Sequence, residues 1–186
     1  NIVHALAISG TNVYAAGRFT MAGGRSAYNV AKWNGSAWSP LGAGMNNWVL
    51  ALAVSDTNLY AGGNFSTAGG VSANRVARWN GSSWSALGSG LGAVMGFDSV
   101  RALAVSGTNL YAGGSFATAG LTTVNNVASW NGSSWTAMGS GMNHTVESLA
   151  VSGMTLYAGG WFTTAGSVSA KGIARWDGGG WSALGS

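Results

Sequence analysis

The sequence contains no cysteine, so it can form neither disulfide bonds nor thiolate metal sites, and it offers no cysteine nucleophile. Charged residues are also scarce, at 6% of the chain, whereas an average soluble domain has about 25%. No apolar run approaches the roughly 18 residues needed to span a bilayer, because Gly, Ser, Thr and Asn interrupt every one. We therefore expect a protein that does not insert into membranes and owes its solubility mainly to neutral hydrogen-bonding groups.

Acidic residues are fewer than basic ones, four against eight, which gives a formal net charge of +4. The basic residues are scattered along the chain, whereas nucleic-acid binders usually gather them into a patch or stripe. The sequence therefore predicts no nucleic-acid partner. Low charge together with abundant Gly, Ser, Thr, Asn and Trp favours a secreted or cell-surface protein. Because the chain does not begin with Met, we expect it to be processed or to be a piece of a longer protein.

Internal repetition is the most prominent feature that the sequence does contain. The phrase Ala-Leu-Ala-Ile at 5–8 returns in related form three times, and its leucines are separated by 46, 51 and 46 residues. Every copy continues with a Tyr, then a Phe, then two Trp, and closes on Leu-Gly or Met-Gly. A fixed period of this length is typical of repeat architectures. The sequence therefore predicts four copies of one unit, with approximate boundaries at 1–46, 47–97, 98–143 and 144–186.

The longer middle step comes from an insertion at 91–99, between the second and third copies. Insertions into individual repeats usually lie in loops, often on the binding face. We expect this segment to form such a loop.

Each copy divides into four short extended segments separated by turn residues; in the third copy the first three are 100–105, 110–116 and 126–130. A helical interpretation fails, because Gly is frequent and β-branched and aromatic residues dominate the segments. One such sheet cannot bury both of its faces alone, whereas copies arranged around an axis can. The sequence therefore predicts an all-β fold, a β-propeller built from four-stranded antiparallel blades.

The third and fourth segments of each copy meet at Asn-Gly, which is Asp-Gly in the fourth copy. These pairs favour a two-residue type I′ hairpin, because both central residues need positive φ. Such a turn at 34–35 would place Trp33 opposite Ser36 and make Trp33 and Trp38 diagonal neighbours on one face. We expect the paired Trp residues to pack between blades.

A Gly-Gly pair follows Leu-Tyr-Ala in the second segment of three copies and indicates a place where another backbone comes close. With this pair and the aromatic residue before the closing Trp, the unit resembles the kelch-type repeat, in particular the kelch-like repeats of Rax2-type surface proteins and of secreted bacterial proteins. The resemblance covers all four copies, although the turn at 34–35 is shorter than the usual kelch turn and Ala16 replaces one Gly. It implies a propeller scaffold and no single function.

The number of copies leaves the closure of the propeller open, since propellers typically use roughly four to eight blades. Four copies are compatible with a small closed ring, with two chains completing an eight-bladed ring, or with a fragment of a longer array. A homo-oligomer that completes or stacks propellers is therefore among the expected partners.

Groups able to perform catalysis are few and dispersed. The acids Asp56, Asp98, Glu147 and Asp177 are spread along three of the copies, and the two histidines, His4 and His144, have no metal-ligand spacing. Some kelch-like propellers belong to copper oxidases, whose chemistry needs His, Tyr and Cys, and this chain does not meet that requirement. We expect no enzymatic activity, no metal site and no cofactor.

The residues that differ between copies are the candidates for function, because the constant ones explain the fold. A sugar site needs an aromatic ring for stacking and polar groups that bond hydroxyls. The candidate ligand-binding residues are Arg18, Arg25, Tyr28, Asn47, Trp48, Asn64, His144 and Trp161. They predict a binding module whose ligand is a glycan or a protein. Two alternatives remain open: Trp48 and Trp161 merely fill gaps between blades, or the chain is a structural or adhesive part of an extracellular assembly built by blade-to-blade contacts.

Overall fold

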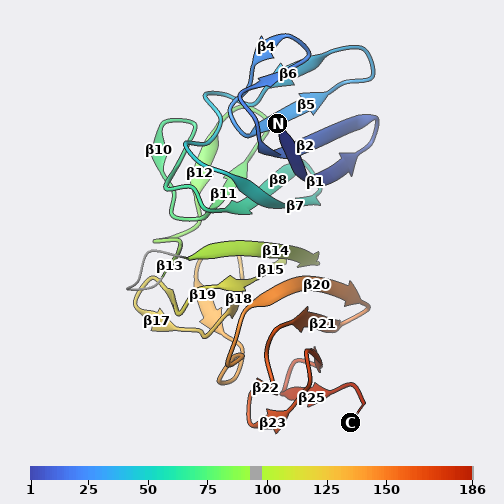
Figure 1. Cartoon of the computed structure of the whole chain (residues 1–186), viewed down its shortest axis with the longest axis vertical. Coiled ribbons are helices and arrows are strands. Elements are labelled where there is room, and N and C mark those ends of the chain that lie inside the picture. Colours follow the sequence, from blue (N-terminus) through green and yellow to red (C-terminus); the bar gives the residue numbers. More distant parts are fainter. Residues whose placement is uncertain (93–97, 186) are drawn as a thin grey trace. The chain divides into compact units, whose positions relative to one another are not determined.

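The computed structural model describes residues 1–92 and 98–185, and this part of the chain contains strands and turns but no helix (Figure 1). Four sheets have four strands each, and the strands within them are antiparallel. Each sheet is formed by one copy of the repeat and is called here blade 1, 2, 3 or 4 in chain order. The predicted all-β propeller of four-stranded blades is confirmed. Over these residues no helix is long and apolar enough to cross a membrane.

The strands of each blade are listed in spatial order from one edge of its sheet to the other. Blade 1 contains β1 (Ile2–Ser9), β2 (Asn12–Arg18), β5 (Val30–Trp33) and β6 (Trp38–Pro40). Blade 2 contains β7 (Val49–Ser55), β8 (Asn58–Gly63), β11 (Val76–Trp79) and β12 (Trp84–Ala86). Blade 3 contains β14 (Ser99–Ser106), β15 (Asn109–Ser115), β18 (Val127–Trp130) and β19 (Trp135–Ala137). Blade 4 contains β20 (Val146–Ser152), β21 (Thr155–Gly160), β24 (Ile173–Trp176) and β25 (Trp181–Ala183).

The first two strands of every blade pair through a β-bulge. In blade 2 the register shifts between Val49 and Ala51, and Gly63 lies at this point with its Cβ position overlapping the carbonyl oxygen of Trp48. The predicted close approach of backbones is thus confirmed, and the two backbones belong to the same blade. Equivalent overlaps occur at Gly17, Gly114 and Gly160. At the first position of the Gly pair a Cβ would come closest to side chains and not to backbone, Val146 at Gly113 and Ser148 at Gly159, and Ala16 occupies this position in blade 1.

The connection between the second and third strands contains an additional two-stranded hairpin, where the sequence indicated only a loop. In blade 1 this hairpin pairs β3 (Met21–Ala22) with β4 (Arg25–Ser26), and Gly23 and Gly24 between them have positive φ. The other blades have β9 (Thr67–Ala68) with β10 (Val71–Ser72), β16 (Thr118–Ala119) with β17 (Thr122–Thr123), and β22 (Thr164–Ala165) with β23 (Val168–Ser169). Segments of two residues are too short to show a strand pattern in the sequence.

The predicted insertion at 91–99 is only partly described. Its start forms β13 (Leu91–Gly92), which pairs with β16. Its end enters β14 at Ser99. Residues 93–97, and with them the predicted loop, lie outside the described residues.

The turn between the third and fourth strands differs from the predicted two-residue hairpin. Trp33 pairs directly with Trp38, so the loop comprises the four residues 34–37. The Oδ1 atom of Asn34 accepts backbone N–H bonds from two and three residues further on, at 3.0 and 2.8 Å, and only Gly35 has positive φ. This side-chain bonding replaces the second left-handed residue that a type I′ turn needs. The two indoles therefore lie directly opposite each other, with ring centroids 5.7 Å apart.

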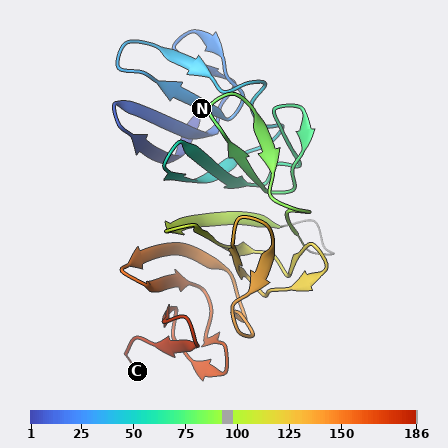
Figure 2. The same cartoon turned by 180° about the vertical axis from the view of Figure 1, so that it is seen from behind.

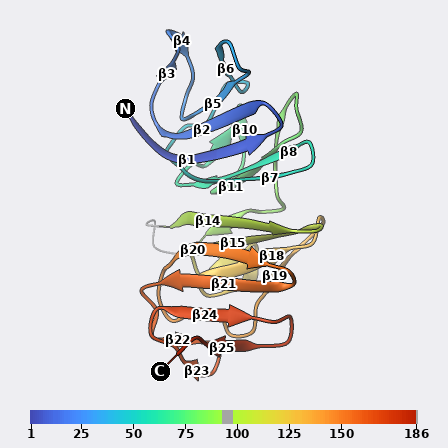
Figure 3. The same ribbon diagram turned by 90° about the vertical axis from the view of Figure 1, so that its right-hand side faces the viewer.

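The chain divides into two compact units, a first unit of blades 1 and 2 (Asn1–Gly90) and a second unit of blades 3 and 4 (Leu91–Ser186). Within the first unit, β7 packs beside β1, as Figure 2 also shows from behind. Within the second unit, β20 packs beside β14 (Figure 3). Each unit thus contains one complete contact between consecutive blades.

A buried tryptophan ties the two blades of each unit together. In the first unit, Nε1 of Trp84 donates a hydrogen bond to the carbonyl oxygen of Leu41 at 2.8 Å. In the second unit, Nε1 of Trp181 donates to the carbonyl oxygen of Met138 at the same distance. Both indoles are buried, so each covers apolar surface while satisfying its only polar group.

Candidate ligand-binding site

A pocket of about 400 Å³ lies in the first unit, where strand β2 ends and the link into blade 2 begins. Its lining combines an arginine and two aromatic residues with a threonine and four amides. The lining residues are Asn1, Arg18, Phe19, Thr20, Asn29, Asn46, Asn47 and Trp48. Three of the residues predicted to bind a ligand, Arg18, Asn47 and Trp48, are therefore brought together.

Arg18 and Trp48 form the centre of this pocket. Arg18 is the last residue of β2, and Trp48 directly precedes β7, so consecutive blades supply the two side chains. The Cζ atom of Arg18 lies 4.7 Å from the centroid of the Trp48 ring, a cation–π contact. Among the described residues the Arg18 guanidinium has no hydrogen bond or ion pair. Its N–H groups are therefore available to a ligand, and the indole is 40% exposed beside them.

The asparagines around this pair differ in whether their side chains can still form hydrogen bonds to a ligand. The side chain of Asn46 is fully engaged: its Oδ1 accepts from the backbone of Ser66 and Thr67 at 2.9 and 3.0 Å, and its Nδ2 donates to Ser66 Oγ at 2.9 Å. Asn47 uses only Oδ1, which accepts from the backbone N–H of Trp48 at 2.8 Å. Within the described part of the chain, Nδ2 of Asn47 thus stays open to a ligand.

Asn29 is a pocket residue that sequence reasoning missed. Its Nδ2 donates to the carbonyl oxygen of Met45 at 2.9 Å, which holds the link between blades. Its backbone has a φ of 65°, a conformation that Asn tolerates better than most residues. The equivalent position before the third strand is Arg75, Asn126 or Gly172 in the other blades, and its positive φ in all four is visible only in the structure.

The remaining candidates of the first unit lie outside the pocket lining. Asn64 is a near neighbour, since its backbone N–H donates to the carbonyl oxygen of Trp48 at 2.9 Å. Arg25 is exposed on β4. Tyr28 is exposed too, and its carbonyl oxygen accepts from the backbone of Met45 at 3.0 Å. These three residues are not brought into one site with Arg18.

His144 and Trp161 come together in the second unit. Nδ1 of His144 accepts from the backbone N–H of Thr145 at 2.8 Å, and the backbone N–H of Trp161 donates to the carbonyl oxygen of Thr145 at 3.0 Å. The Trp161 side chain is 71% exposed. The two residues thus repeat the arrangement of Asn47 and Asn64 around Trp48, without an arginine.

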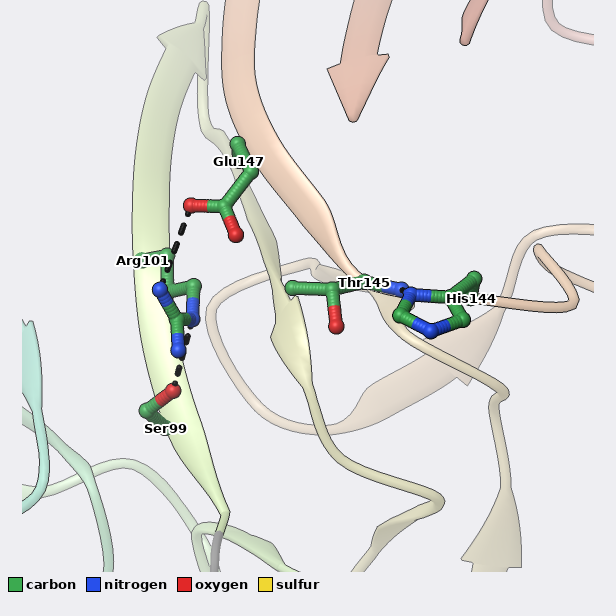
Figure 4. Close-up of polar contacts among 5 residues, drawn as sticks. All are labelled: Ser99, Arg101, His144, Thr145 and Glu147. Carbon is green, nitrogen blue, oxygen red and sulfur yellow. Dashed lines mark hydrogen bonds and ion pairs between the residues drawn. The ribbon is translucent and has the colours of Figure 1, made fainter. Parts of the chain in front are cut away.

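An ion pair lies near His144 without including it. Nη1 of Arg101 on β14 is 3.3 Å from Oε2 of Glu147 on β20, and Nε of Arg101 donates to Ser99 Oγ at 3.1 Å. In Figure 4 this pair is separated from the His144 ring by Thr145. Arg101 and Glu147 satisfy each other, and such an exposed pair contributes little to stability.

A smaller pocket of about 180 Å³ lies in the second unit; its lining residues are Asp98, Ser115, Phe116, Ala117, Asn125 and Asn126. Across the described residues, no cluster of three or more His, Cys, Asp or Glu side chains is placed to hold a metal ion. The chemistry that the first-unit pocket offers is therefore recognition, by one free cation, amides and an aromatic ring.

Neither a model of a known protein family nor a curated protein matches this sequence. Solved structures do resemble its fold. The computationally designed Ika8 protein is 18% identical, with a TM-score of 0.57 over 96% of this chain, which spans about half (46%) of that longer chain. The computationally designed Ika4 protein is 16% identical, with a TM-score of 0.56 over 94% of this chain and 90% of that one. At these identities the likeness shows a repeated all-β fold and nothing about function.

Proposed function

We propose that the chain is a non-catalytic, lectin-like binding module that holds a carbohydrate in the pocket around Arg18 and Trp48. The observation that carries this proposal is the exposed Trp48 indole inside a polar pocket. A sugar ring has an apolar C–H face that stacks on an indole and hydroxyls that bond to amides and to a guanidinium. Arg18, which lies over the Trp48 ring, and Asn47, which precedes Trp48 in the chain, supply such donors.

The setting we propose for this module is a kelch-like, Rax2-type propeller of a secreted or cell-surface protein, without a nucleic-acid partner. Its support is the repeat pattern, together with a surface that carries few charges and many neutral hydrogen-bonding groups. Repeats of this kind serve mainly as scaffolds that present loops, which agrees with a pocket formed by loop-end residues of consecutive blades.

A glycan array probed with the fluorescently labelled 186-residue chain tests the proposal. We expect binding to a defined set of glycans and its loss in Trp48→Ala, because stacking of a nucleobase on an aromatic ring contributes about 1–3 kcal/mol and we expect a sugar face on Trp48 to contribute on the same order. Trp161→Ala is the matched control, since it removes an even more exposed tryptophan that does not line this pocket. Binding that survives Trp48→Ala would contradict the site.

A second function, assembly through blade faces, is favoured by the exposure of blade 1. Val49 in blade 2 and Val146 in blade 4 are fully buried at the same repeat position where Val3 in blade 1 is 56% exposed. Beside Val3 lies an apolar groove of about 430 Å³ that includes Leu6 and Trp38. Exposed apolar surface of this kind is typical of an interaction site.

The two units show which surface fits against such a face. Val30 and Val49 belong to one core cluster in the first unit, and Val127 and Val146 to another in the second. The position of Val30 thus packs with the position of Val49 in the next blade. In blade 4 the former position is Ile173, and it is 44% exposed. We therefore propose that blade 4 of a second copy covers blade 1, which light scattering would detect as a species heavier than one chain.

A further inference from the structure

The net charge of the protein is confined to its first unit. This unit contains five basic residues and a single acid, Asp56; the basic residues are Arg18, Arg25, Lys32, Arg75 and Arg78. The second unit contains three of each sign, namely Arg101, Lys171 and Arg175 against Asp98, Glu147 and Asp177. The whole formal charge of +4 therefore belongs to the first unit, and one of its cations, Arg18, lines the pocket.

Nothing in the first unit neutralises the cation in this pocket. Asp56 lies in the turn between β7 and β8. That turn precedes β8, whereas Arg18 ends β2, so the two charges are at opposite ends of equivalent strands. A strand of six residues spans about 20 Å, well beyond the screening length of about 8 Å at physiological ionic strength. Arg18 is therefore a full positive charge held against an aromatic ring.

The second unit contains a related pocket that has no arginine in its lining. Phe116 and Asn126 occupy the positions that Phe19 and Asn29 hold in blade 1, so the framework of the two pockets is shared. Ser115 stands where blade 1 has Arg18.

Two further positions also differ between the first pocket and its counterpart in the second unit. Asp98, which is buried, stands in the second pocket where the first has Asn1. Thr145 takes the position of Trp48 in the link to the next blade. Across these positions the pocket changes from one with Arg18 and Trp48 to one with Asp98 and Ser115, and Asp98 itself already has an interaction partner. Of the two pockets, the cation and the exposed indole therefore belong to the first.

We infer that the pocket of the first unit selects a carboxylated sugar, whose carboxylate is bound by the Arg18 guanidinium while the sugar ring lies along the exposed part of Trp48. This inference rests on the proposed carbohydrate-binding function and adds the charge of the ligand. Arginine suits the role because its planar fork of N–H donors matches a carboxylate with two parallel hydrogen bonds. The contact with the indole restrains the guanidinium, which lowers the entropy lost on binding.

Calorimetric titration of the full chain with tetragalacturonate and with its methyl ester tests this inference, because the ester keeps the sugar chain but replaces each carboxylate by an uncharged methyl ester. We expect the ester to bind at least about tenfold more weakly, in line with hydrogen bonds to charged groups. Arg18→Ser, which copies the residue of blade 3, should abolish the preference. Arg25→Ser changes the net charge equally at a site outside the pocket and should retain it. Added salt should weaken binding of the acid more than that of the ester.

Failure of the inference is distinguishable from failure of the proposed function. Equal binding of acid and ester, lost together in Trp48→Ala, overturns the charge selection and leaves a carbohydrate site. A preference for acid that persists in Arg18→Ser also overturns it. Binding of neither probe, combined with neutral glycans as the only array hits, contradicts the inference alone. Binding of neither probe and of no arrayed glycan contradicts both.

Discussion

At the scale of single residues, the second glycine of each Gly pair is required by the bulge it faces. A methyl group at Gly63 would overlap the carbonyl oxygen of Trp48, and this backbone atom cannot rotate away as a side chain would. We expect Gly63→Ala to lower the free energy of unfolding by about 1–3 kcal/mol, the usual effect of overpacking. Chemical denaturation followed by tryptophan fluorescence measures this change. Since Trp48 lines the pocket, ligand affinity should fall as well.

The control for this substitution is Gly180→Ala. Gly180 has free space around its Cβ position, and the same loop position is Ala37 in blade 1. We expect its free energy of unfolding to stay within about 0.5 kcal/mol of the parent, as for most surface substitutions. Equal effects of the two changes would contradict overlap with the Trp48 carbonyl oxygen as the cause of the cost, because the lost flexibility of glycine by itself stabilises the folded state.

Departure from the repeat is a partial guide to the candidate site. It identified Arg18, Asn47 and Trp48, because a residue that breaks a structural repeat is released from packing constraints. The same criterion selected Trp161 and Arg25, which line no part of this pocket. Asn29 escaped it because its role depends on a bond to Met45, 16 residues along the chain. Convergence of separate links is a property of three-dimensional packing, which the periodicity does not specify.

At the scale of elements, the loop between the third and fourth strands shows that an Asn-Gly pair alone does not determine the length of a turn. Asn-Gly predicts a two-residue turn, yet Asn131 bonds the N–H groups of Ser133 and Ser134 through its side chain at 3.0 and 2.9 Å. That bonding needs two further loop residues, which pairs Trp130 directly with Trp135. The strands were predictable from their apolar and aromatic residues. The competition between side-chain and backbone acceptors for the same N–H groups decided the register, and the sequence contains both acceptors without ranking them.

In blade 4 the same loop carries a charge. Hydrogen bonds from the backbone N–H groups of Gly179 and Gly180, at 3.0 and 3.1 Å, lower the pKa of Asp177 below its usual value of 3.8. A depressed folded-state pKa contributes stability that is present above the ordinary pKa and is lost as pH falls through the folded value. We expect the urea midpoint of the parent to drop below about pH 4. The drop should be smaller in D177N, whose amide oxygen accepts both bonds without titrating.

The other three Asp and Glu side chains are present in both proteins, so their contribution to the pH dependence of stability cancels when parent and variant are compared. The urea midpoint measured between about pH 2 and 6 provides the test. Superimposable pH profiles for the two proteins would mean that these backbone bonds do not favour the ionised form.

At the scale of the whole molecule, the fold class followed from the repeat because every copy carries the same turns, aromatic residues and glycines. The division into two units did not follow, since blades 2 and 3 are joined by a link that differs from the others only in length. The confinement of charge to one unit is visible in the sequence once that division is known. Periodicity therefore predicts the blade, whereas the differences between copies carry the information about sites and partners.

Mutations in the blade faces can distinguish two kinds of assembly contact, blade 1 on blade 4 and blade 1 on blade 1. If blade 1 of one copy packs on blade 4 of another, Leu6→Lys and Ile173→Lys should each reduce the heavier species seen by light scattering, because each buries an unpaired charge. A mixture of the two variants should recover part of it, since each supplies the intact face that the other lacks. A contact between two copies of blade 1 would be isologous; Ile173→Lys would then have no effect and mixing would restore nothing.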